Sequence, residues 1–188
     1  MSAVFGPVAL TAHPAGPTGP LRSLAASGTL GTGGQLALEF DLHGDLLQLR
    51  LADPARQPAR RDELWRHTCL ECFAAPPGQP GYLEFNFSAA GDWAAYRFAD
   101  YRAARSDLAA TAVNIGAQIL DPDHLRVSVH ASVGAHFDAG WRLSVAAVIE
   151  DIHGGLSYWA AHHPRPQPDF HDRDGFRIAP RTTGTQNA

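Results

Sequence analysis

Two short segments, residues 67–73 and 82–88, each carry a glutamate among apolar side chains, Glu71 in the first and Glu84 in the second. In an extended strand, residues two apart point to the same face, so Asn86 shares the face of Glu84. A carboxylate inside an apolar strand is costly unless it is hydrogen-bonded or in contact with water. We therefore expect these side chains to line a groove across one sheet, or else to lie on an ordinary solvated face.

Aromatic residues near these acids indicate what such a groove would bind. Sugars have apolar C–H faces that stack on flat rings, and hydroxyl groups that hydrogen-bond carboxylates, amides and guanidinium groups. The combination of rings with carboxylates and an amide is therefore typical of a site for a polyhydroxylated ligand. The rings closest in the sequence are Trp65, Tyr82, Trp93 and Tyr96.

Cys69 and Cys72 form a C-x-x-C motif, which raises the possibility of redox chemistry or zinc binding. The surrounding residues 67–74 predict a strand, in which residues three apart point to opposite faces. A redox pair requires a helix N-terminus, and a zinc ribbon requires a second cysteine pair that this chain lacks. We predict that both cysteines are small buried apolar residues.

Histidines and aspartates gather in residues 162–174, where a metal site is one interpretation. Three prolines in this segment favour a stiff, extended loop over a compact set of ligands. The run Asp172-Arg173-Asp174-Gly175 also lacks the other ligands of a calcium loop. We therefore predict a hydrated loop and no metal site. The residues concerned are His162, His163, Asp169, His171, Asp172 and Asp174.

The prolines fall in clusters, and the long stretches between them are predicted to form strands because proline cannot donate to a central ladder. Alternation of apolar and polar residues supports this prediction. We expect roughly nine to eleven short strands, with turns at a spacing of about 8–12 residues that is typical of a β-sandwich. The predicted strands include residues 35–40, 46–51, 67–74, 82–87, 93–98, 125–133, 141–149 and 156–162.

The sequence thus predicts an all-β protein, a single antiparallel β-sandwich domain over residues 1–181, followed by a flexible tail at residues 182–188. Residues 43–45 are expected to form a hairpin turn, and residues 121–123 a tight turn between two strands. Residues 100–112 are rich in Ala and Arg and are compatible with either a short helix or a loop.

Composition excludes several classes of protein. The 188 residues are 45% hydrophobic, enough to bury one core. A net charge of −4 argues against nucleic-acid binding, which requires a basic face. The longest apolar run, about seven residues, is far below the ~20 of a membrane helix, so no membrane contact is expected. The N-terminal residues lack a basic start before an apolar run, so we expect a cytoplasmic protein.

Residues 62–96 resemble the DOMON-like domains, and most of all the branch related to carbohydrate-binding module family nine. The resemblance lies in Trp65 ahead of the run LECF, which contains Glu71, and in the following run LEFNF, which contains Asn86. It implies a DOMON-like or immunoglobulin-like β-sandwich whose relatives bind sugars or haem and are usually not catalytic alone.

The resemblance also implies roles for particular residues. By position, Trp65 matches the first of two rings that clamp a sugar, and Glu71 matches a carboxylate that grips its hydroxyls. Asn86 and Arg97 are implied as polar partners, and Trp159 as the second ring.

We therefore expect a non-catalytic module, with no cofactor or metal, that holds a sugar-like small molecule. One alternative is a haem-binding electron-transfer domain with two histidine ligands, because the only methionine is Met1. The other is a glycoside-acting enzyme with Glu71 and Glu84 as acid and base. The predicted site residues are Trp65, Glu71, Glu84, Asn86, Arg97 and Trp159.

Overall fold

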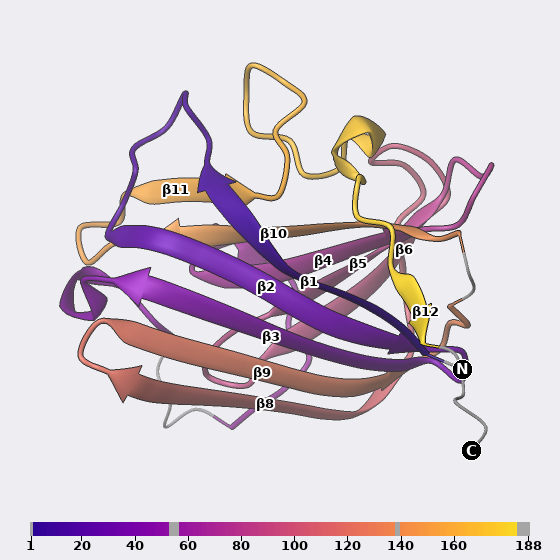
Figure 1. Ribbon diagram of the computed structural model, residues 1–188, viewed down its shortest axis with the longest axis horizontal. Coiled ribbons are helices and arrows are strands. Elements are labelled where there is room, and N and C mark those ends of the chain that lie inside the picture. The colour runs from indigo at the N-terminus through magenta and orange to yellow at the C-terminus, as the bar shows by residue number, and fades with distance from the viewer. Residues whose placement is uncertain (1, 53–56, 138–139, 184–188) are drawn as a thin grey trace.

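The computed structural model describes residues 2–52, 57–137 and 140–183 (Figure 1). In these ranges the chain forms twelve β-strands and three single-turn 3₁₀ helices. The strands are β1 (Ser2–Ala12), β2 (Leu21–Gly31), β3 (Gln35–Gly44), β4 (Cys69–Ala75), β5 (Tyr82–Phe87), β6 (Trp93–Phe98), β7 (Ser106–Asp107), β8 (Ala110–Asp121), β9 (His124–Val133), β10 (Arg142–Glu150), β11 (Leu156–Ala160) and β12 (Arg181–Thr183). The helices are η1 (Leu46–Gln48), η2 (Leu64–Arg66) and η3 (Arg173–Gly175).

The strands form two antiparallel sheets that share one long strand. Sheet A has the order β12-β1-β2-β3-β9-β8, and sheet B has the order β7-β6-β5-β4-β10-β11. Strand β1 joins them, because most of it pairs with β2 whereas Thr11 and Ala12 pair with β11. Figure 1 shows β1 rising from the front sheet to β11. The predicted antiparallel β-sandwich is confirmed.

Apolar side chains on the facing sides of the two sheets form the main core. Strand β3 buries every second residue from Leu36 to Leu42, and β5 contributes Leu83, Phe85 and Phe87. The outer side of sheet B is also covered, so β4 and β5 are buried on both faces. Polar residues on that outer side are therefore withdrawn from bulk water.

A second apolar cluster lies on the outer side of sheet B, beneath the segment that follows β11. The rings of Tyr82 and Phe98 are stacked with centroids 4.9 Å apart, and those of Phe73 and Phe176 are 5.8 Å apart. Because Phe176 belongs to the covering segment, this cluster fastens that segment to the sheet.

The proline-containing N-terminal region, which is not among the predicted strands, forms β1. The pairing of β1 with β2 shifts register between Phe5 and Val8, on either side of Pro7. A bulge tolerates proline because the ladder does not require its missing N–H there. A proline inside an apolar run therefore does not always end a strand.

The strand predicted at residues 46–51 and the hairpin turn predicted at residues 43–45 are wrong. Strand β3 runs through Gly44, and the next residues form η1. The Asp45 carboxylate accepts a hydrogen bond of 3.1 Å from the Leu47 N–H and so caps this helix. Leu47 is 86% exposed, so the alternation of leucines does not reflect a buried strand face.

Residues 100–112 form a turn, β7 and the start of β8 rather than a helix. Arg102, Ala104 and Ala112 have φ angles of 50°, 48° and 50°, which a right-handed helix cannot contain. At the C-terminal end, Thr182 pairs with Ala3 in β12, so residues 182 and 183, predicted as tail, belong to sheet A. The rest of the predicted tail, residues 184–188, lies outside the described residues.

Candidate functional site

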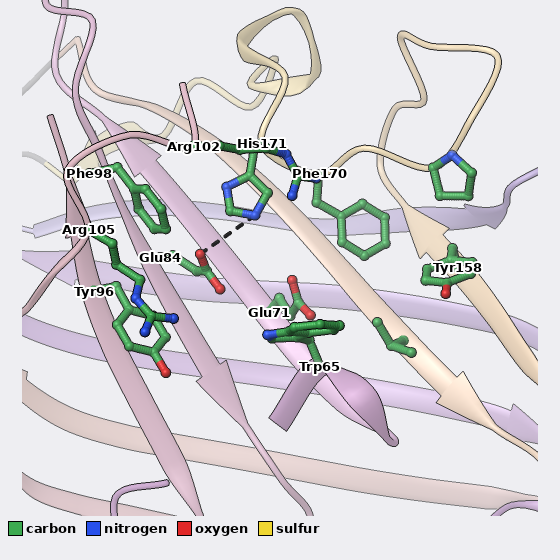
Figure 2. Close-up of a pocket in the computed structure, with 12 residues that line it drawn as sticks. Trp65, Glu71, Glu84, Tyr96, Phe98, Arg102, Arg105, Tyr158, Phe170 and His171 are labelled. Carbon is green, nitrogen blue, oxygen red and sulfur yellow. Dashed lines mark ion pairs between the residues drawn. The ribbon is translucent and has the colours of Figure 1, made fainter. Parts of the chain in front are cut away.

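The outer side of sheet B carries a cavity of about 490 Å³ (Figure 2). Strands β4, β5, β6, β10 and β11 form its floor. Its sides are formed by η2, the loop of residues 99–105 and the segment of residues 161–172, here called the wall segment. The lining residues are Trp65, Glu71, Glu84, Tyr96, Phe98, Arg102, Arg105, Val148, Tyr158, Pro168, Phe170 and His171.

Hydrogen bonds hold the wall segment against strand β1 and its following turn. His163 Nε2 lies 2.8 Å from the carbonyl oxygen of Thr11, and His13 Nε2 lies 3.1 Å from that of Arg165. The Arg165 guanidinium forms an ion pair with Asp172. The histidine and aspartate cluster seen in the sequence is therefore partly used to fix the wall.

The wall segment is also tied to the loop after β6. The Asp169 carboxylate accepts hydrogen bonds from the Tyr101 hydroxyl at 2.6 Å and from the Arg102 guanidinium at 3.0 Å. Burial raises the pKa of Asp169, but these two donors outweigh it and lower the pKa below its ordinary value. Asp169 is thus a carboxylate that neutralises Arg102 at the rim of the cavity.

Two buried acids from neighbouring strands line the floor. Glu71 of β4 is 3% exposed and Glu84 of β5 is 4% exposed. The Cα partner of Glu71 is Asn86, whose side-chain amide donates a hydrogen bond of 2.6 Å to Glu84 Oε1. Among the described residues, nothing hydrogen-bonds Glu71 Oε1 or Asn86 Oδ1. Glu71 Oε1 and Asn86 Oδ1 are therefore buried acceptor atoms that lack donors.

Burial is the main cause of the perturbed acidity of this pair. It raises the pKa of Glu71 well above the ordinary 4.5, and the neighbouring Glu84 carboxylate raises it further. Burial also raises the pKa of Glu84, although the hydrogen bond from Asn86 and the charges of Arg105 and Arg102 oppose the rise. Glu71, which has the fewer stabilising partners, is therefore the acid of the pair that takes up a proton more readily.

His171 is the histidine that lines the cavity, and it is uncharged at neutral pH. Burial, followed by the charge of Arg102, lowers its pKa to about 4. The Tyr82 oxygen accepts the backbone N–H of Arg102 at 3.1 Å and lies 2.7 Å from His171 Nδ1. We assign the Tyr82 hydroxyl as the donor and His171 Nδ1 as the acceptor. The ring hydrogen of the neutral imidazole is then on Nε2, which lies 3.8 Å from Glu84 Oε2. At that distance the neutral imidazole forms neither an ion pair nor a hydrogen bond with Glu84.

The acidity of Glu71 predicts a pH dependence of stability that Glu71→Gln removes. Between 4.5 and its raised pKa, the folded state binds more protons at Glu71 than the unfolded state, so stability falls as pH rises. His171 acts in the opposite direction between about 4 and its ordinary 6.5. His171 is present in both proteins, so its contribution largely cancels in the difference between them. Between pH 4.5 and the raised pKa of Glu71 we therefore expect wild type to lose up to about 1.4 kcal/mol per pH unit relative to Glu71→Gln, measured by urea unfolding.

The matched control for this measurement is Glu39→Gln, a carboxylate of sheet A whose side chain is 40% exposed. Its difference from wild type should stay nearly constant with pH over the same range. Parallel pH profiles for wild type and Glu71→Gln would contradict a proton on Glu71.

Aromatic rings surround the two acids. Trp65, which η2 places at the mouth of the cavity, is 46% exposed. In Figure 2, Trp65 and Phe170 lie on opposite sides of Glu71, and Tyr158 lies farther along the cavity. The Arg105 guanidinium lies over the ring of Tyr96, 4.7 Å from its centroid. The cavity thus combines an accessible flat ring with a polar floor.

Of the six residues predicted for the site, the structure brings Trp65, Glu71 and Glu84 together in the cavity. Asn86 is fully buried behind them and reaches the site through its hydrogen bond to Glu84. Arg97 is exposed and does not line the cavity, because it alternates with Tyr96 along β6 and points to the other side of the sheet.

Trp159 also lies away from the cavity. It is 5% exposed, belongs to the main core between the sheets, and donates its indole N–H to Ser157 Oγ at 3.1 Å. Its neighbour Tyr158 lines the cavity instead. Neighbouring residues of a strand point to opposite faces, so Trp159 points into the core and Tyr158 into the cavity.

The remaining lining residues come from segments whose position the sequence did not indicate. Arg102 and Arg105 precede the short strand β7, and Phe170 and His171 follow the three prolines of the wall segment. The sequence singled out His171 only as part of a histidine and aspartate cluster. A loop returning over the strand that carries Tyr158 is a long-range feature, which local periodicity does not encode.

The other motifs have structural positions. Cys72 points into the main core. Cys69 lies on the opposite face of β4, which is the face that carries Glu71. Both cysteines are free and buried. Asp172 accepts the Asp174 N–H at 2.8 Å and caps η3. In the part of the chain that the structure describes, no three His, Cys, Asp or Glu side chains are grouped as metal ligands.

Comparisons with known proteins place this architecture among solved structures. No model of a protein family matches the chain, and no curated protein matches it in sequence. A crystal structure from Bacteroides uniformis ATCC 8492, described as a "putative carbohydrate-binding protein", superimposes with a TM-score of 0.59. The two chains share one fold. They are 13% identical, over 90% of this chain and 84% of that chain.

A second solved structure is a carbohydrate-binding module of family 9 from Caldicellulosiruptor kristjanssonii in complex with glucose. It has a TM-score of 0.41 and 13% identity, over 73% of this chain and 66% of that chain. Separately, none of the helices found in residues 2–52, 57–137 and 140–183 is long and apolar enough to cross a membrane.

Proposed function

We propose that the cavity on sheet B binds a small carbohydrate, either a monosaccharide or the end of an oligosaccharide. The observation that carries this proposal is the accessible ring of Trp65 beside two buried acids, Glu71 and Glu84, in one cavity of about 490 Å³. This volume falls within the range of about 300–1,000 Å³ that is usual for small-molecule sites. The shared fold with a protein described as carbohydrate-binding adds support.

The arrangement gives each part of a sugar a partner. The C–H face of a pyranose ring would stack on Trp65, and Phe170 or Tyr158 would contact its other face. Hydroxyl hydrogens would satisfy the acceptor atoms of Glu84 and Glu71, and the Arg102 and Arg105 guanidinium groups would donate to hydroxyl oxygens. Such contacts replace those with water and predict dissociation constants in the micromolar to millimolar range.

Calorimetric titration of the intact chain with a panel of neutral mono- and disaccharides tests this proposal. We expect at least one sugar to bind with a saturable heat and to shift the tryptophan fluorescence, because Trp65 leaves water on binding. Absence of both signals across the panel at millimolar concentration would refute carbohydrate binding.

The haem alternative does not fit the residues of the cavity. His171 is the histidine that lines it, and Nδ1 of that residue is engaged by Tyr82. His13 and His163 contact each other edge to face, but both face backbone carbonyl oxygens. Among the described residues, no second histidine faces His171 across the cavity to complete an axial pair.

Glycoside hydrolysis is the second candidate function, because the two carboxyls meet at the floor of a cavity. Their environments differ in the sense such chemistry requires: burial raises the pKa of Glu71 well above its ordinary value, and Glu84 is hydrogen-bonded by Asn86. Release of nitrophenol from aryl glycosides, lost in both Glu71→Gln and Glu84→Gln, would establish hydrolysis. Binding without turnover would leave carbohydrate recognition alone.

A further inference from the structure

Arginine charges act on the two acids of the floor only from a distance. In the described part of the chain, no arginine nitrogen lies within ion-pair distance of Glu71 or Glu84. Glu71 lines the cavity and is more than nine-tenths buried, and among the described residues its Oε1 atom has no hydrogen-bond partner. A buried carboxylate without a partner is costly unless it takes up a proton or a cation enters the site.

The groups around the pair leave one acid without a compensating charge once Glu71 loses its proton. The charged and titratable side chains that face the acids are Cys69 of β4, Tyr82 of β5, Tyr96 of β6, Arg102 and Arg105 of the loop after β6, and His171 of the wall segment. Asp169 neutralises Arg102, and His171 is uncharged at neutral pH. Of the described lining residues, Arg105 is then the cation whose charge Asp169 does not offset, and it balances only one of the two acids when both are ionised.

The rings of the cavity favour a cation for an independent reason. An ammonium group near the face of an aromatic ring is attracted by the negative charge of that face. Trp65, Tyr96, Phe98, Tyr158 and Phe170 all line this cavity. Arginines already lie over two of these rings, Arg66 over Trp65 at 5.4 Å and Arg105 over Tyr96 at 4.7 Å.

From this geometry we infer that the sugar recognised by the cavity carries a primary ammonium group, which lies at the floor between Glu71 and Glu84. The inference rests on the proposed carbohydrate function and names its ligand class, an amino sugar. The three N–H donors of an ammonium match the donor-poor acceptors of the floor. When the ligand binds, Glu71 releases its proton to the buffer, and the positive charge of the ammonium group takes the place of that proton. The ammonium group keeps all its own protons.

The test compares glucosamine with glucose by calorimetry of the wild-type chain at about pH 6, where amines with a pKa of about 7.7 are protonated. Chloride is matched between the two titrations. We expect glucosamine to bind at least about tenfold more tightly than glucose, since hydrogen bonds to charged groups are the stronger ones. N-Acetylglucosamine, whose nitrogen is uncharged, should lose this advantage.

Proton release supplies a second readout. Titrations in two buffers with different ionisation enthalpies give the number of protons exchanged on binding. We expect a net release of up to about one proton with glucosamine and almost none with glucose, because only the cation lowers the pKa of Glu71. The affinity for glucosamine should accordingly rise between about pH 5 and pH 6.5.

Glu84→Gln removes one charge of the pair with little change of shape. It should reduce the affinity for glucosamine to within about threefold of that for glucose. Glu39→Gln, which makes the same change on sheet A, should leave the preference intact. If Glu84→Gln does not fold, the wild-type comparison of the two sugars decides the inference alone. Equal affinity for both sugars overturns the ammonium site and leaves carbohydrate binding standing, whereas no binding of any sugar overturns both.

Discussion

Trp159→Ala should lower the free energy of unfolding by about 3–5 kcal/mol, the cost expected for removing a large buried ring. Trp159 is 5% exposed and lies in the main core between the sheets. The truncation opens a cavity in the core. It also removes the indole N–H that donates to Ser157 Oγ at 3.1 Å, and Ser157 is fully buried. Urea unfolding monitored by far-ultraviolet circular dichroism measures the loss.

Trp159→Phe is the companion variant, because it retains a ring in the core and should cost clearly less than alanine. If the alanine variant is too unstable to purify, the phenylalanine variant still shows whether a smaller side chain at this position lowers the free energy of unfolding. A Trp159→Ala protein that keeps wild-type stability but loses sugar affinity would instead place this ring at the ligand, as the family resemblance implies.

Alternation of apolar and polar residues was sufficient to predict the strands where no capping residue or proline acted against it. Strands such as β5 and β9 alternate apolar and polar residues, and both form close to the predicted positions. The prediction at residues 46–51 was wrong because Asp45 caps a helical turn in which alternation has no meaning. The prediction near Pro7 was incomplete because a bulge accommodates the proline.

The floor of the site was predictable for a related physical reason. An acid among apolar residues signals an unusual environment, and Glu71 and Glu84 do lie buried side by side on paired strands. The walls were not predictable. Phe170 and His171 reach the cavity through a loop held by His13 and His163, contacts that join residues about 150 positions apart. The choice between Tyr158 and Trp159 depended on a register that only the pairing of β11 with β10 decides.

Trp65→Ala should weaken sugar binding by about 10- to 100-fold, because a ring of this size contributes about 1.5–3 kcal/mol when a ligand buries it. Its effect on the free energy of unfolding should stay within about 0.5 kcal/mol, since the side chain is 46% exposed. The same calorimetric titration of a binding sugar measures the first effect, and urea unfolding measures the second.

The two tryptophans thus form a matched pair, in which one variant changes binding and the other changes stability. Leu47→Ala provides a further control, because Leu47 is 86% exposed and does not line the cavity. It should alter neither measurement. Trp65→Phe should recover part of the lost affinity, because a smaller ring still offers a flat apolar face. If Trp65→Ala binds sugar as tightly as wild type, the ligand does not stack on this ring, and recognition would have to rest on the acids and on the opposite wall.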